Sequence, residues 1–452
     1  MKAKKSVLVT LAVLGMQAPA FAADLLDTYH AAQGQDSVFA AAKSARDAGS
    51  ERLTQGRSTL LPSVNLTATS TYNNNEINYT NAPTTALISG PSKFINNTAA
   101  ITLVQPLYRQ NNWKIYSQSE LQAEQADLQY KSAEQDLIVR AAQAYFDVLA
   151  AQDAVNLADA QKVAIGEQLA QAKRNFEVGS ATITDTLEAQ ARYDLTNTQA
   201  ISAQSNLEIK QRSYQQLTKD LPRNLKTVGD SMKMELPQPA DEDKWVEQAM
   251  DGNLQLGSAK AAAEIAEKEV EKARGGHYPT LDLIASYSKT KINPVGDGTF
   301  NNGNNAVEND QTNSYVGVQL NVPLFQGGST NSKWREAADN RDRANSELES
   351  ARRNVDLQTR QAYTGVVNGM TQVQALEQAL KSSEKLLEAS KLGHEVGVRT
   401  NLDVLNAQQQ LYATRRDLAQ AKYNYLVSRL KLKQAIGALS EDELKVVNQA
   451  LQ

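Results

Sequence analysis

One phrase occurs twice in this chain, and a duplicated unit limits the possible folds more than any single motif does. Residues 177–190 read EVGSATITDTLEAQ and residues 395–408 read EVGVRTNLDVLNAQ, with eight of fourteen positions identical at an offset of 218. The similarity continues upstream at an offset of 217, where LPSVNLTATSTY (61–72) resembles YPTLDLIASYSK (278–289). A unit of roughly two hundred residues is far longer than the 20–50 residues of solenoid repeats. The sequence therefore predicts an internal two-fold repeat, each copy forming half of one domain.

The repeat sets the expected domain boundaries. Repeat 1 is expected over 23–235 and repeat 2 over 244–440, joined by the linker LPQPADED at 236–243 and followed by a C-terminal tail at 441–452. Residues 1–22 combine lysines, a short apolar run and Ala20-Phe21-Ala22, which is typical of a cleavable secretory signal. The chain has no cysteine, so an exported protein of this sequence is held together by packing alone.

Each repeat is expected to begin with a helix and then to form two strands. The strands are predicted at about 62–73 and 98–107 in repeat 1, and at about 279–289 and 314–324 in repeat 2, because apolar and polar residues alternate there. Each segment has about ten residues, the length of a tilted membrane-spanning strand. Soluble hairpins with one wet face fit this pattern too, and the pattern alone leaves both interpretations open.

Two Pro-free stretches rich in Ala, Gln, Leu and Glu predict very long helices. They cover about 115–176 and 331–392, near sixty residues each, or roughly 90 Å at 1.5 Å per residue. A shorter helix follows each one, which gives helical hairpins over 115–220 and 331–438. The repeated phrase is the expected turn of each hairpin. Gly179 and Gly397 fit the helix C-caps, and Thr-x-x-Asp capping boxes start the next helices.

Four strands cannot close a barrel, and lipid does not tolerate an open sheet edge. The membrane interpretation therefore needs several chains: two would give eight strands and a filled barrel, and three would give twelve strands and a lumen. The residues alone do not choose between these numbers.

Composition and motifs argue against catalysis and against nucleic-acid binding. The formal net charge is −4, or −7 without the three signal lysines, and no basic tract suggests a nucleic acid. His30, His277 and His394 lack metal-ligand spacing, and the QGGST stretch lacks the lysine of a phosphate loop. No enzyme activity, catalytic residue, metal or cofactor is expected. Two other non-enzymes stay open, a periplasmic adaptor with one hairpin and a structural coiled-coil protein.

Taken together, these phrases resemble the TolC-type outer-membrane efflux proteins. The resemblance runs from Asp24-Leu25-Leu26 through YPTLDLIAS, VPLFQGG, EVGVRTNLDVLNAQ and AKYNYLVSRLKLKQAIGAL (421–439). It implies a mixed α/β membrane protein: a homotrimeric channel whose 12-stranded outer-membrane β-barrel takes four strands from each chain and continues as a long periplasmic α-helical barrel. It also implies contact with outer-membrane lipid, a periplasmic membrane-fusion adaptor and an inner-membrane transporter of RND, ABC or MFS type. The expected function is a passive exit duct for efflux, type I protein secretion or both, in a Gram-negative bacterium.

The resemblance also implies a gate at the helix tips, closed at rest by an Arg, a Thr-Asp pair and an aromatic residue. Arg399 matches the Arg, Thr184 and Asp185 match the pair, and Asp403 matches an Asp ring. Spacing alone favours Asp403 as a simple helix cap, and the resemblance reverses that preference. Arg399 occupies the position of Ala181 in the first repeat, so the copies differ where a gate needs asymmetry.

Two positions depart from the family pattern, and a second set of residues marks the expected docking tips. Asn406 stands where a second Asp ring is typical, and His394 stands where a Tyr is typical. Because a histidine changes its charge in mildly acidic solution, opening of this gate is hypothesised to be acid-sensitive. The residues implied to contact the adaptor are Val178, Gly179, Val396 and Gly397.

Overall fold

Four antiparallel strands and nine α-helices make up the described part of this computed structural model, residues 23–77, 90–222, 224–229, 234–295, 309–449 and 451. The expected secretory signal at 1–22 lies outside these residues. In chain order the elements are α1 (Leu25–Gln35), α2 (Ser37–Ser58), β1 (Ser63–Ile77), β2 (Gly90–Tyr108), α3 (Gln110–Glu177), α4 (Ile183–Thr218), α5 (Glu242–Gly252), α6 (Leu254–Arg274), a 3-10 turn (Gly275–His277), β3 (Thr280–Pro294), β4 (Asn309–Asn321), α7 (Ser329–Glu395), α8 (Asn401–Ala435) and α9 (Glu441–Asn448).

The chain divides into two compact units that cut across the predicted repeats. The hairpin unit comprises Met1–Ala41, Ser132–Asn253 and Val355–Gln452, and the sheet unit comprises Ala42–Lys131 and Leu254–Asn354. Each unit therefore takes segments from both repeats, and the long helices α3 and α7 contribute to both units. A repeat is a unit of sequence here, whereas the contacts gather the strands into one unit and the helical hairpins into the other.

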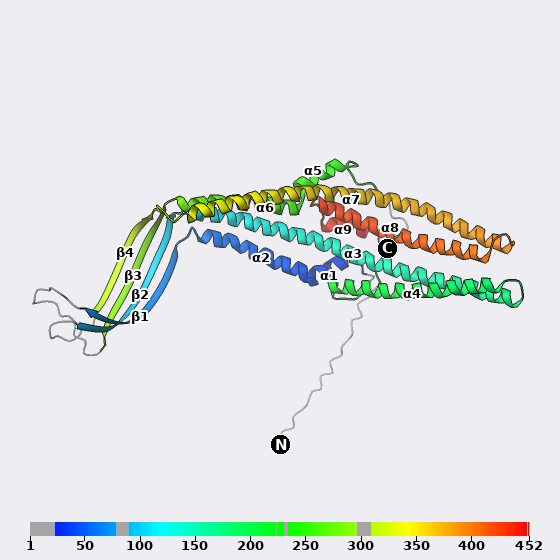
Figure 1. Ribbon diagram of the computed structural model, residues 1–452, viewed down its shortest axis with the longest axis horizontal. Coiled ribbons are helices and arrows are strands. Elements are labelled where there is room, and N and C mark those ends of the chain that lie inside the picture. The colour runs from blue at the N-terminus through cyan, green and yellow to red at the C-terminus, as the bar shows by residue number, and fades with distance from the viewer. Residues whose placement is uncertain are drawn as a thin grey trace, which may run out of the picture. The chain divides into compact units, whose positions relative to one another are not determined.

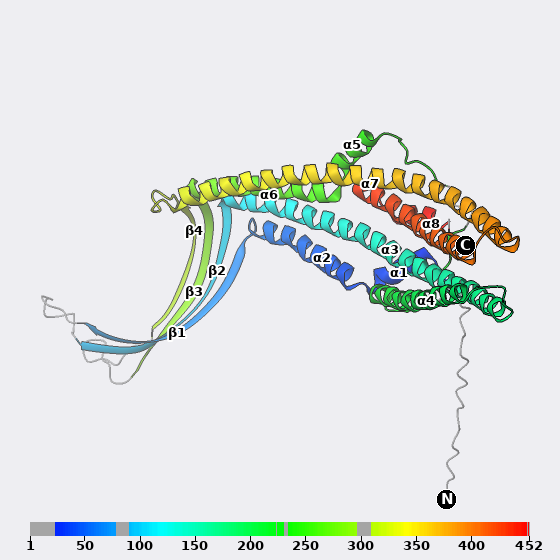
Figure 2. The ribbon, with the colours of Figure 1, turned by 45° about the vertical axis from the view of Figure 1, so that its right-hand side comes forward.

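The sheet unit contains a single four-stranded sheet in the order β1-β2-β3-β4, with every pair antiparallel (Figures 1 and 2). The strands have 15, 19, 15 and 13 residues, longer than the expected length of about ten. The expectation missed the loop-side residues of all four strands, where the apolar alternation gives way to other residues. It also extended the fourth strand to 324, whereas β4 ends at Asn321. Ladder hydrogen bonds use only backbone groups, so residues 90–97 and 290–294 continue the strands without a regular apolar alternation.

The register places apolar side chains on one face of the sheet and polar side chains on the other. The apolar face carries Val64, Leu66, Ala68, Ile101, Leu103, Leu283, Ala285, Tyr287, Val316, Val318 and Leu320. The polar face carries Asn65, Thr67, Thr69, Thr98, Thr102, Ser286, Ser288, Asn313 and Gln319. On that face Thr98 and Thr290 hydroxyls lie 3.1 Å apart in a hydrogen bond. Many apolar-face side chains are exposed, including Leu66, Val316 and Val318.

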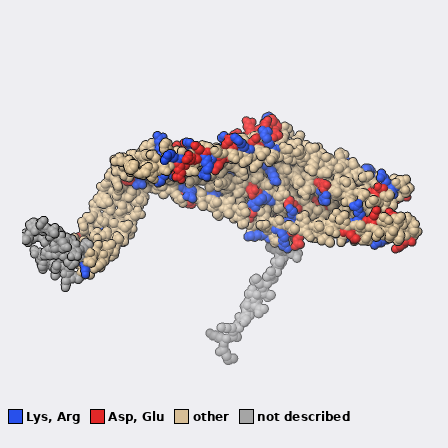
Figure 3. Space-filling model, viewed as in Figure 1, with Lys and Arg blue, Asp and Glu red and all other residues tan. Residues whose placement is uncertain are grey.

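Most residues of each strand carry no charge. Residues 63–74, 94–108, 283–288 and 311–321 contain no Asp, Glu, Lys or Arg. Figure 3 shows the strands as a largely uncharged surface, whereas both signs of charge are mixed over the helices. At the helix-side end, Asp282 of β3 is buried, and Arg109 donates to its two oxygens from Nε at 2.7 Å and from Nη2 at 2.6 Å.

Helices of the sheet unit approach closely where the sequence supplies small residues. A Cβ atom on Gly56 of α2 would lie 2.0 Å from Ser119 Oγ of α3, so only glycine permits this contact. The first part of α3 also contacts α6, because Gln118 Nε2 donates to Glu269 Oε2 at 2.8 Å and to the Ile265 carbonyl at 3.2 Å. These contacts hold α2 and α6 against the first part of α3, next to the strands.

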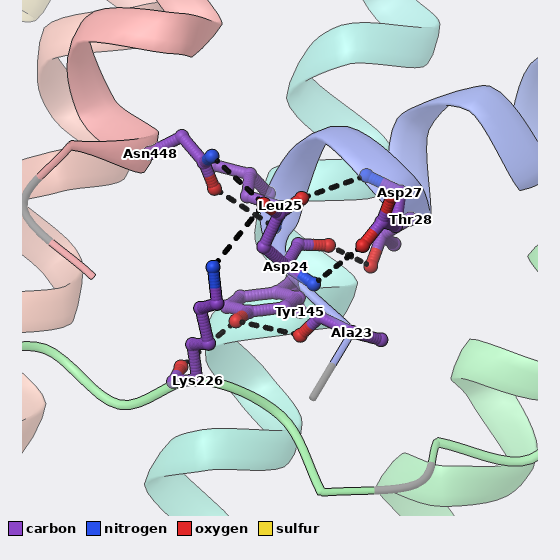
Figure 4. A network of polar contacts seen from close by, with 8 residues as sticks. All are labelled: Ala23, Asp24, Leu25, Asp27, Thr28, Tyr145, Lys226 and Asn448. Carbon is purple, nitrogen blue, oxygen red and sulfur yellow. Dashed lines mark hydrogen bonds and ion pairs between the residues drawn. The ribbon is translucent and has the colours of Figure 1, made fainter. Parts of the chain in front are cut away.

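The hairpin unit is built from α3 with α4 and α7 with α8, each pair folded back on itself (Figures 1 and 2). Its core includes the fully buried Tyr145, Phe146, Tyr425 and Leu426. Figure 4 shows how chain segments distant in sequence meet at Tyr145, whose hydroxyl donates to the Lys226 carbonyl at 2.8 Å. Asn448 of α9 donates to Asp24 Oδ2 at 3.1 Å, which ties α9 to the start of α1.

The segment expected as a C-terminal tail is therefore mostly structured. Glu441–Asn448 forms α9, and both Leu444 and Val447 are buried. Leu451 pairs with Val228 in an isolated β-bridge. The apolar residues of 441–452 are spaced as an amphipathic helix, and burial of that face gives the segment its order.

Candidate gate at the helix tips

The first helix tip joins α3 to α4 through a glycine turn. Gly179 adopts φ +79°, its N–H donates to the Phe176 carbonyl at 3.0 Å, and the Ser180 N–H donates to the Asn175 carbonyl at 2.8 Å. Next, Thr182 caps α4: its hydroxyl accepts from the Asp185 N–H at 3.2 Å, while Asp185 Oδ2 accepts from the Thr182 N–H at 2.9 Å. Both the predicted glycine cap and the predicted capping box are confirmed.

The second tip repeats this geometry between α7 and α8. Gly397 adopts φ +78°, and the Val398 N–H donates to the Gly393 carbonyl at 2.9 Å. Thr400 accepts from the Asp403 N–H at 3.2 Å, and Asp403 Oδ2 accepts from the Thr400 N–H at 2.9 Å. The repeated phrase thus encodes the same tight turn twice.

We expect Gly397→Ala to loosen the second tip. An alanine at φ +78° costs about 1 kcal/mol, because the left-handed region brings its Cβ close to its own backbone. A Cβ at this position meets nothing within 4 Å, so the cost is conformational alone. Amide hydrogen exchange at Val398 should accelerate roughly fivefold. The Gly397→Asn variant is the control, because asparagine tolerates this region, and equal exchange rates in both variants would contradict the assignment.

The charged residues of the second tip lie close together. Arg399 Nη1 is 3.7 Å from Asp403 Oδ1, and His394 Nδ1 is 3.2 Å from the carbonyl oxygen of Arg399. Hydrogen bonds from the Thr400 backbone and hydroxyl, together with the charge of Arg399, lower the pKa of Asp403. Asp403 is therefore both a helix cap and an ionised carboxylate at neutral pH.

The capping carboxylate of the first tip, Asp185, is held in its ionised form mainly by its own cap. Hydrogen bonds from Thr182 lower the pKa of Asp185 most, and the charge of His394 lowers this pKa further. No hydrogen bond or ion pair among the described residues joins Arg399 to Thr184 or to Asp185. The Thr184 side chain is exposed, and its hydroxyl makes no hydrogen bond to the described residues. The structure of one chain thus brings together only some of the gate residues that the family resemblance implies.

Arg192 is a tip-region residue that the sequence analysis missed. This α4 side chain donates from Nη2 to Asn406 Oδ1 at 2.9 Å and from Nη1 to Gln409 Oε1 at 2.7 Å, both on α8. It is a direct polar link between the two hairpins of the chain. A signal was present: at the offset of 218, Arg192 corresponds to Gln410, the same kind of asymmetry that singled out Arg399.

The ends of both tips expose apolar side chains. Val178, Val396 and Val398 are each more than half exposed beside the two glycines. Exposed apolar residues on a rigid turn suit contact with a second protein better than contact with water.

Two negative findings narrow what the described residues can do. Within 23–77, 90–222, 224–229, 234–295, 309–449 and 451, no helix combines the length and the hydropathy needed to cross a bilayer. Across the same ranges, His, Cys, Asp and Glu side chains form no cluster of three that could bind a metal ion.

Comparison with solved structures defines the class of protein. The Campylobacter jejuni CmeC outer membrane channel has the same fold, with a TM-score of 0.77 over 100% of this chain and 97% of that chain, at 16% sequence identity. A family model described as "Outer membrane efflux protein" matches residues 28–218 and 245–438 of this chain. This chain belongs to the outer membrane efflux protein family, and it is an outer-membrane protein.

Two curated relatives agree with this assignment. The chain is 34% identical to the outer membrane protein TolC of Vibrio cholerae, over 100% of this chain and 99% of the relative. It is 33% identical to the alkaline protease secretion protein AprF of Pseudomonas aeruginosa, over 96% of this chain and 89% of the relative. The predicted resemblance to TolC-type proteins is confirmed, and the adaptor and coiled-coil alternatives lose their support.

Proposed function

We propose that this protein is the passive exit duct of efflux and type I secretion systems in the outer membrane of a Gram-negative bacterium. The family is one of outer-membrane efflux proteins, and one relative is named for protease secretion. The protein performs no chemistry and needs no cofactor. Its work is to stay closed alone and to open when partner proteins dock.

The main support for this proposal is the four-stranded sheet, which has one apolar face, one polar face and two edge strands that each lack a partner on one side. Every strand exposes at least one apolar side chain on the apolar face, among them Leu66, Ile101, Tyr287 and Val316, which suits lipid. The polar face suits a water-filled lumen. The strands β1 and β4 each pair on one side only. An open edge is not stable in lipid, so further copies must complete the sheet.

A homotrimer fits these requirements. Three copies of a four-stranded sheet supply twelve strands, enough for a barrel with a lumen, whereas eight strands give a barrel filled by its own side chains. In the same assembly α3, α4, α7 and α8 of each copy would line a helical tube in the periplasm.

In the closed duct the tips are held by polar contacts within and between copies. Arg399, Thr184, Asp185 and His394 form the gate, and the link from Arg192 to Asn406 holds the two hairpins of one chain together. We assign Arg192 a positioning role through Asn406. Three copies of Asp403 around one axis would form a ring of carboxylates at the mouth.

The Asp403→Ala variant is expected to lose cation preference. Asp403 is ionised at neutral pH, and a ring of carboxylates attracts cations and binds multivalent cations in its centre. Reversal potentials measured across a bilayer in a salt gradient should shift towards zero, and block by a trivalent cation should weaken several-fold. Asp417→Ala is the matched control, because it removes an exposed carboxylate of the same helix that pairs only with its neighbour Arg416 among the described residues. If both variants kept wild-type selectivity, the ring at Asp403 would be refuted.

Partner proteins that contact the exposed tips would open the duct. Val178, Gly179, Val396 and Gly397 would meet a periplasmic membrane-fusion adaptor, which connects the duct to an inner-membrane transporter of RND, ABC or MFS type. The transporter supplies the energy and selects the cargo.

The proposal is tested by oligomer mass and by export in cells. Native mass measurement of the detergent-extracted protein should give three chains. A strain that lacks the gene should accumulate a fluorescent efflux substrate, and the wild-type gene should restore export. The proposed duct would be contradicted if the detergent-extracted protein were a monomer. It would also be contradicted if cells accumulated as much of the fluorescent substrate after the gene was restored as before.

A further inference from the structure

A small cavity lies within the hairpin unit, at the end of α8 that is remote from the helix tip. Its volume is about 210 Å³, and its walls come from residues 235–238 and from α5, α7, α8 and α9. The apolar part of the wall consists of side chains that are each at most 3% exposed, Trp245, Val366, Leu430, Leu432 and Val447. An apolar wall with a few polar groups is typical of sites for small molecules.

Polar contacts hold this wall in place. Trp245 Nε1 donates to the Pro239 carbonyl at 2.7 Å, which fixes the orientation of the indole ring. Lys433 Nζ lies 2.9 Å from Glu443 Oε1 and 5.9 Å from the centre of the Trp245 ring, so α5, α8 and α9 meet there. The cavity therefore has its shape without a ligand, which lowers the entropy cost of binding one.

Arg429 is the lining residue whose positive charge is left without a partner. Eight of the arginines that the structure describes are partly buried. Seven of them donate to a carboxylate or to an amide oxygen: Arg46, Arg109, Arg140, Arg192, Arg341, Arg360 and Arg415. Arg429 is the eighth, and it makes no hydrogen bond and no ion pair to any described residue. A guanidinium beside an apolar wall attracts an anion more strongly than it would in open water.

The other charges of the cavity need no ligand. Lys433 is neutralised by Glu443, and Glu235 is exposed, so water solvates the Glu235 carboxylate. A cationic ligand would add a second positive charge beside Arg429. A carboxylate would instead accept two parallel hydrogen bonds from the guanidinium. The charges that line the cavity therefore favour an anion.

We propose that this cavity is a binding site for a small carboxylate with an apolar body. The carboxylate pairs with Arg429, and the apolar body lies against Trp245 and Leu430. The volume is below the roughly 300–1,000 Å³ of pockets for drug-sized ligands, so the ligand is about the size of a six-carbon acid or of one amino-acid residue. A free short-chain acid and the C-terminal residue of a peptide share this chemistry. The site does not depend on the proposed duct.

The fluorescence of Trp245 measures binding, because its ring forms part of the wall. The other two tryptophans, Trp113 and Trp334, are exposed, and Trp113→Phe with Trp334→Phe removes their emission. The detergent-extracted protein is titrated with hexanoate and with N-acetyl-leucine, and then with the uncharged hexanamide and N-acetyl-leucinamide. We expect a saturable change in emission with a dissociation constant of about 1 mM for the better acid. Each amide should bind roughly tenfold more weakly than its acid, because it cannot form the charge-assisted pair.

Arg429→Gln tests the role of the guanidinium. This variant should bind both acids roughly tenfold more weakly and both amides as the wild type does, which shows that the cavity is intact. Arg416→Gln is the matched control, because Arg416 is exposed on the same helix and pairs only with Asp417 among the described residues. The control should bind all four probes as the wild type does.

The relative affinity of the two acids identifies the source of the ligand. Tighter binding of hexanoate would indicate a free acid, and tighter binding of N-acetyl-leucine would indicate the C-terminus of a peptide. The proposed site would be overturned if no probe bound saturably, if each acid bound no better than its amide, or if Arg429→Gln and Arg416→Gln had the same effect. These results are separate from the oligomer mass and the export that test the duct.

Discussion

Cells that carry Arg399→Ala as their only copy of the protein are expected to become sensitive to a large glycopeptide antibiotic that the outer membrane normally excludes. At the second tip of the chain, between α7 and α8, Arg399 Nη1 lies 3.7 Å from Asp403 Oδ1. Removing the guanidinium leaves the ionised carboxylate of Asp403 with no cation beside it at the second tip of each copy in the proposed trimer. Repulsion between these carboxylates favours the open tube. Growth inhibition at increasing antibiotic concentrations measures the leak, and we expect a several-fold lower inhibitory concentration.

Arg416→Ala is the matched control for this leak. Arg416 lies on the same helix, α8, is mostly exposed, and pairs only with its neighbour Asp417 among the described residues. Loss of that surface pair should leave antibiotic resistance unchanged. The gate would be refuted if Arg399→Ala and Arg416→Ala cells were equally resistant while both proteins reached the membrane in normal amounts.

The Asp36→Ala variant is expected to lose about 3 kcal/mol of local stability at the junction of α1 and α2, because it removes a buried carboxylate that accepts charged hydrogen bonds from Arg140 and caps the start of α2. Arg140 donates to Asp36 from Nη1 at 2.9 Å and from Nη2 at 3.1 Å, and Asp36 is only 6% exposed. Asp36 also accepts from the Phe39 N–H at 2.6 Å. Amide hydrogen exchange at Phe39 and the next turn of α2 should accelerate roughly a hundredfold.

Asp136→Ala tests the same arginine from its exposed side. Asp136 accepts from Arg140 Nε at 2.7 Å within one helix turn and is half exposed. Its loss should cost less than about 0.5 kcal/mol, so exchange at Phe39 should change little. Equal effects of the two alanine variants would show that burial of Asp36 contributes nothing.

The ion pair between Asp36 and Arg140 also makes local stability depend on pH in acidic solution. Hydrogen bonds from Arg140, together with those from the backbone at Phe39 and Val38, lower the pKa of Asp36. A carboxyl with a lowered folded-state pKa stabilises the fold above its ordinary pKa of about 4, and this contribution is lost as the pH falls below that value. The exchange difference between wild type and Asp36→Asn should therefore be constant near neutral pH and shrink below about pH 4.

Much of the architecture could be predicted from local chemistry. The glycines and the Thr-x-x-Asp boxes specify their turns through backbone geometry and short-range hydrogen bonds, and both are confirmed at Gly179 and Gly397. The family, the outer-membrane location and the exit function are confirmed by the matches across the whole chain. These features depend on residues close together in sequence or on phrases long enough to be specific.

The contacts that depend on tertiary packing could not be predicted. The link from Arg192 to Asn406 joins residues more than two hundred positions apart, and no local pattern determines it. Order in α9 comes from burial of Leu444 against the rest of the hairpin unit. The loop-side ends of the strands were missed because ladder pairing of polar residues depends on the neighbouring strand. The gate residues stay a proposal, because their contacts between copies require the assembly.

The current carried by the purified wild-type protein in a planar lipid bilayer tests the central claim most directly. A closed duct predicts discrete, small current steps, each from one inserted trimer, in the absence of any energy source. Protein that inserts into the bilayer as a trimer, as shown by its mass, and yet carries no current even after Arg399→Ala would contradict the account of this protein as an exit duct.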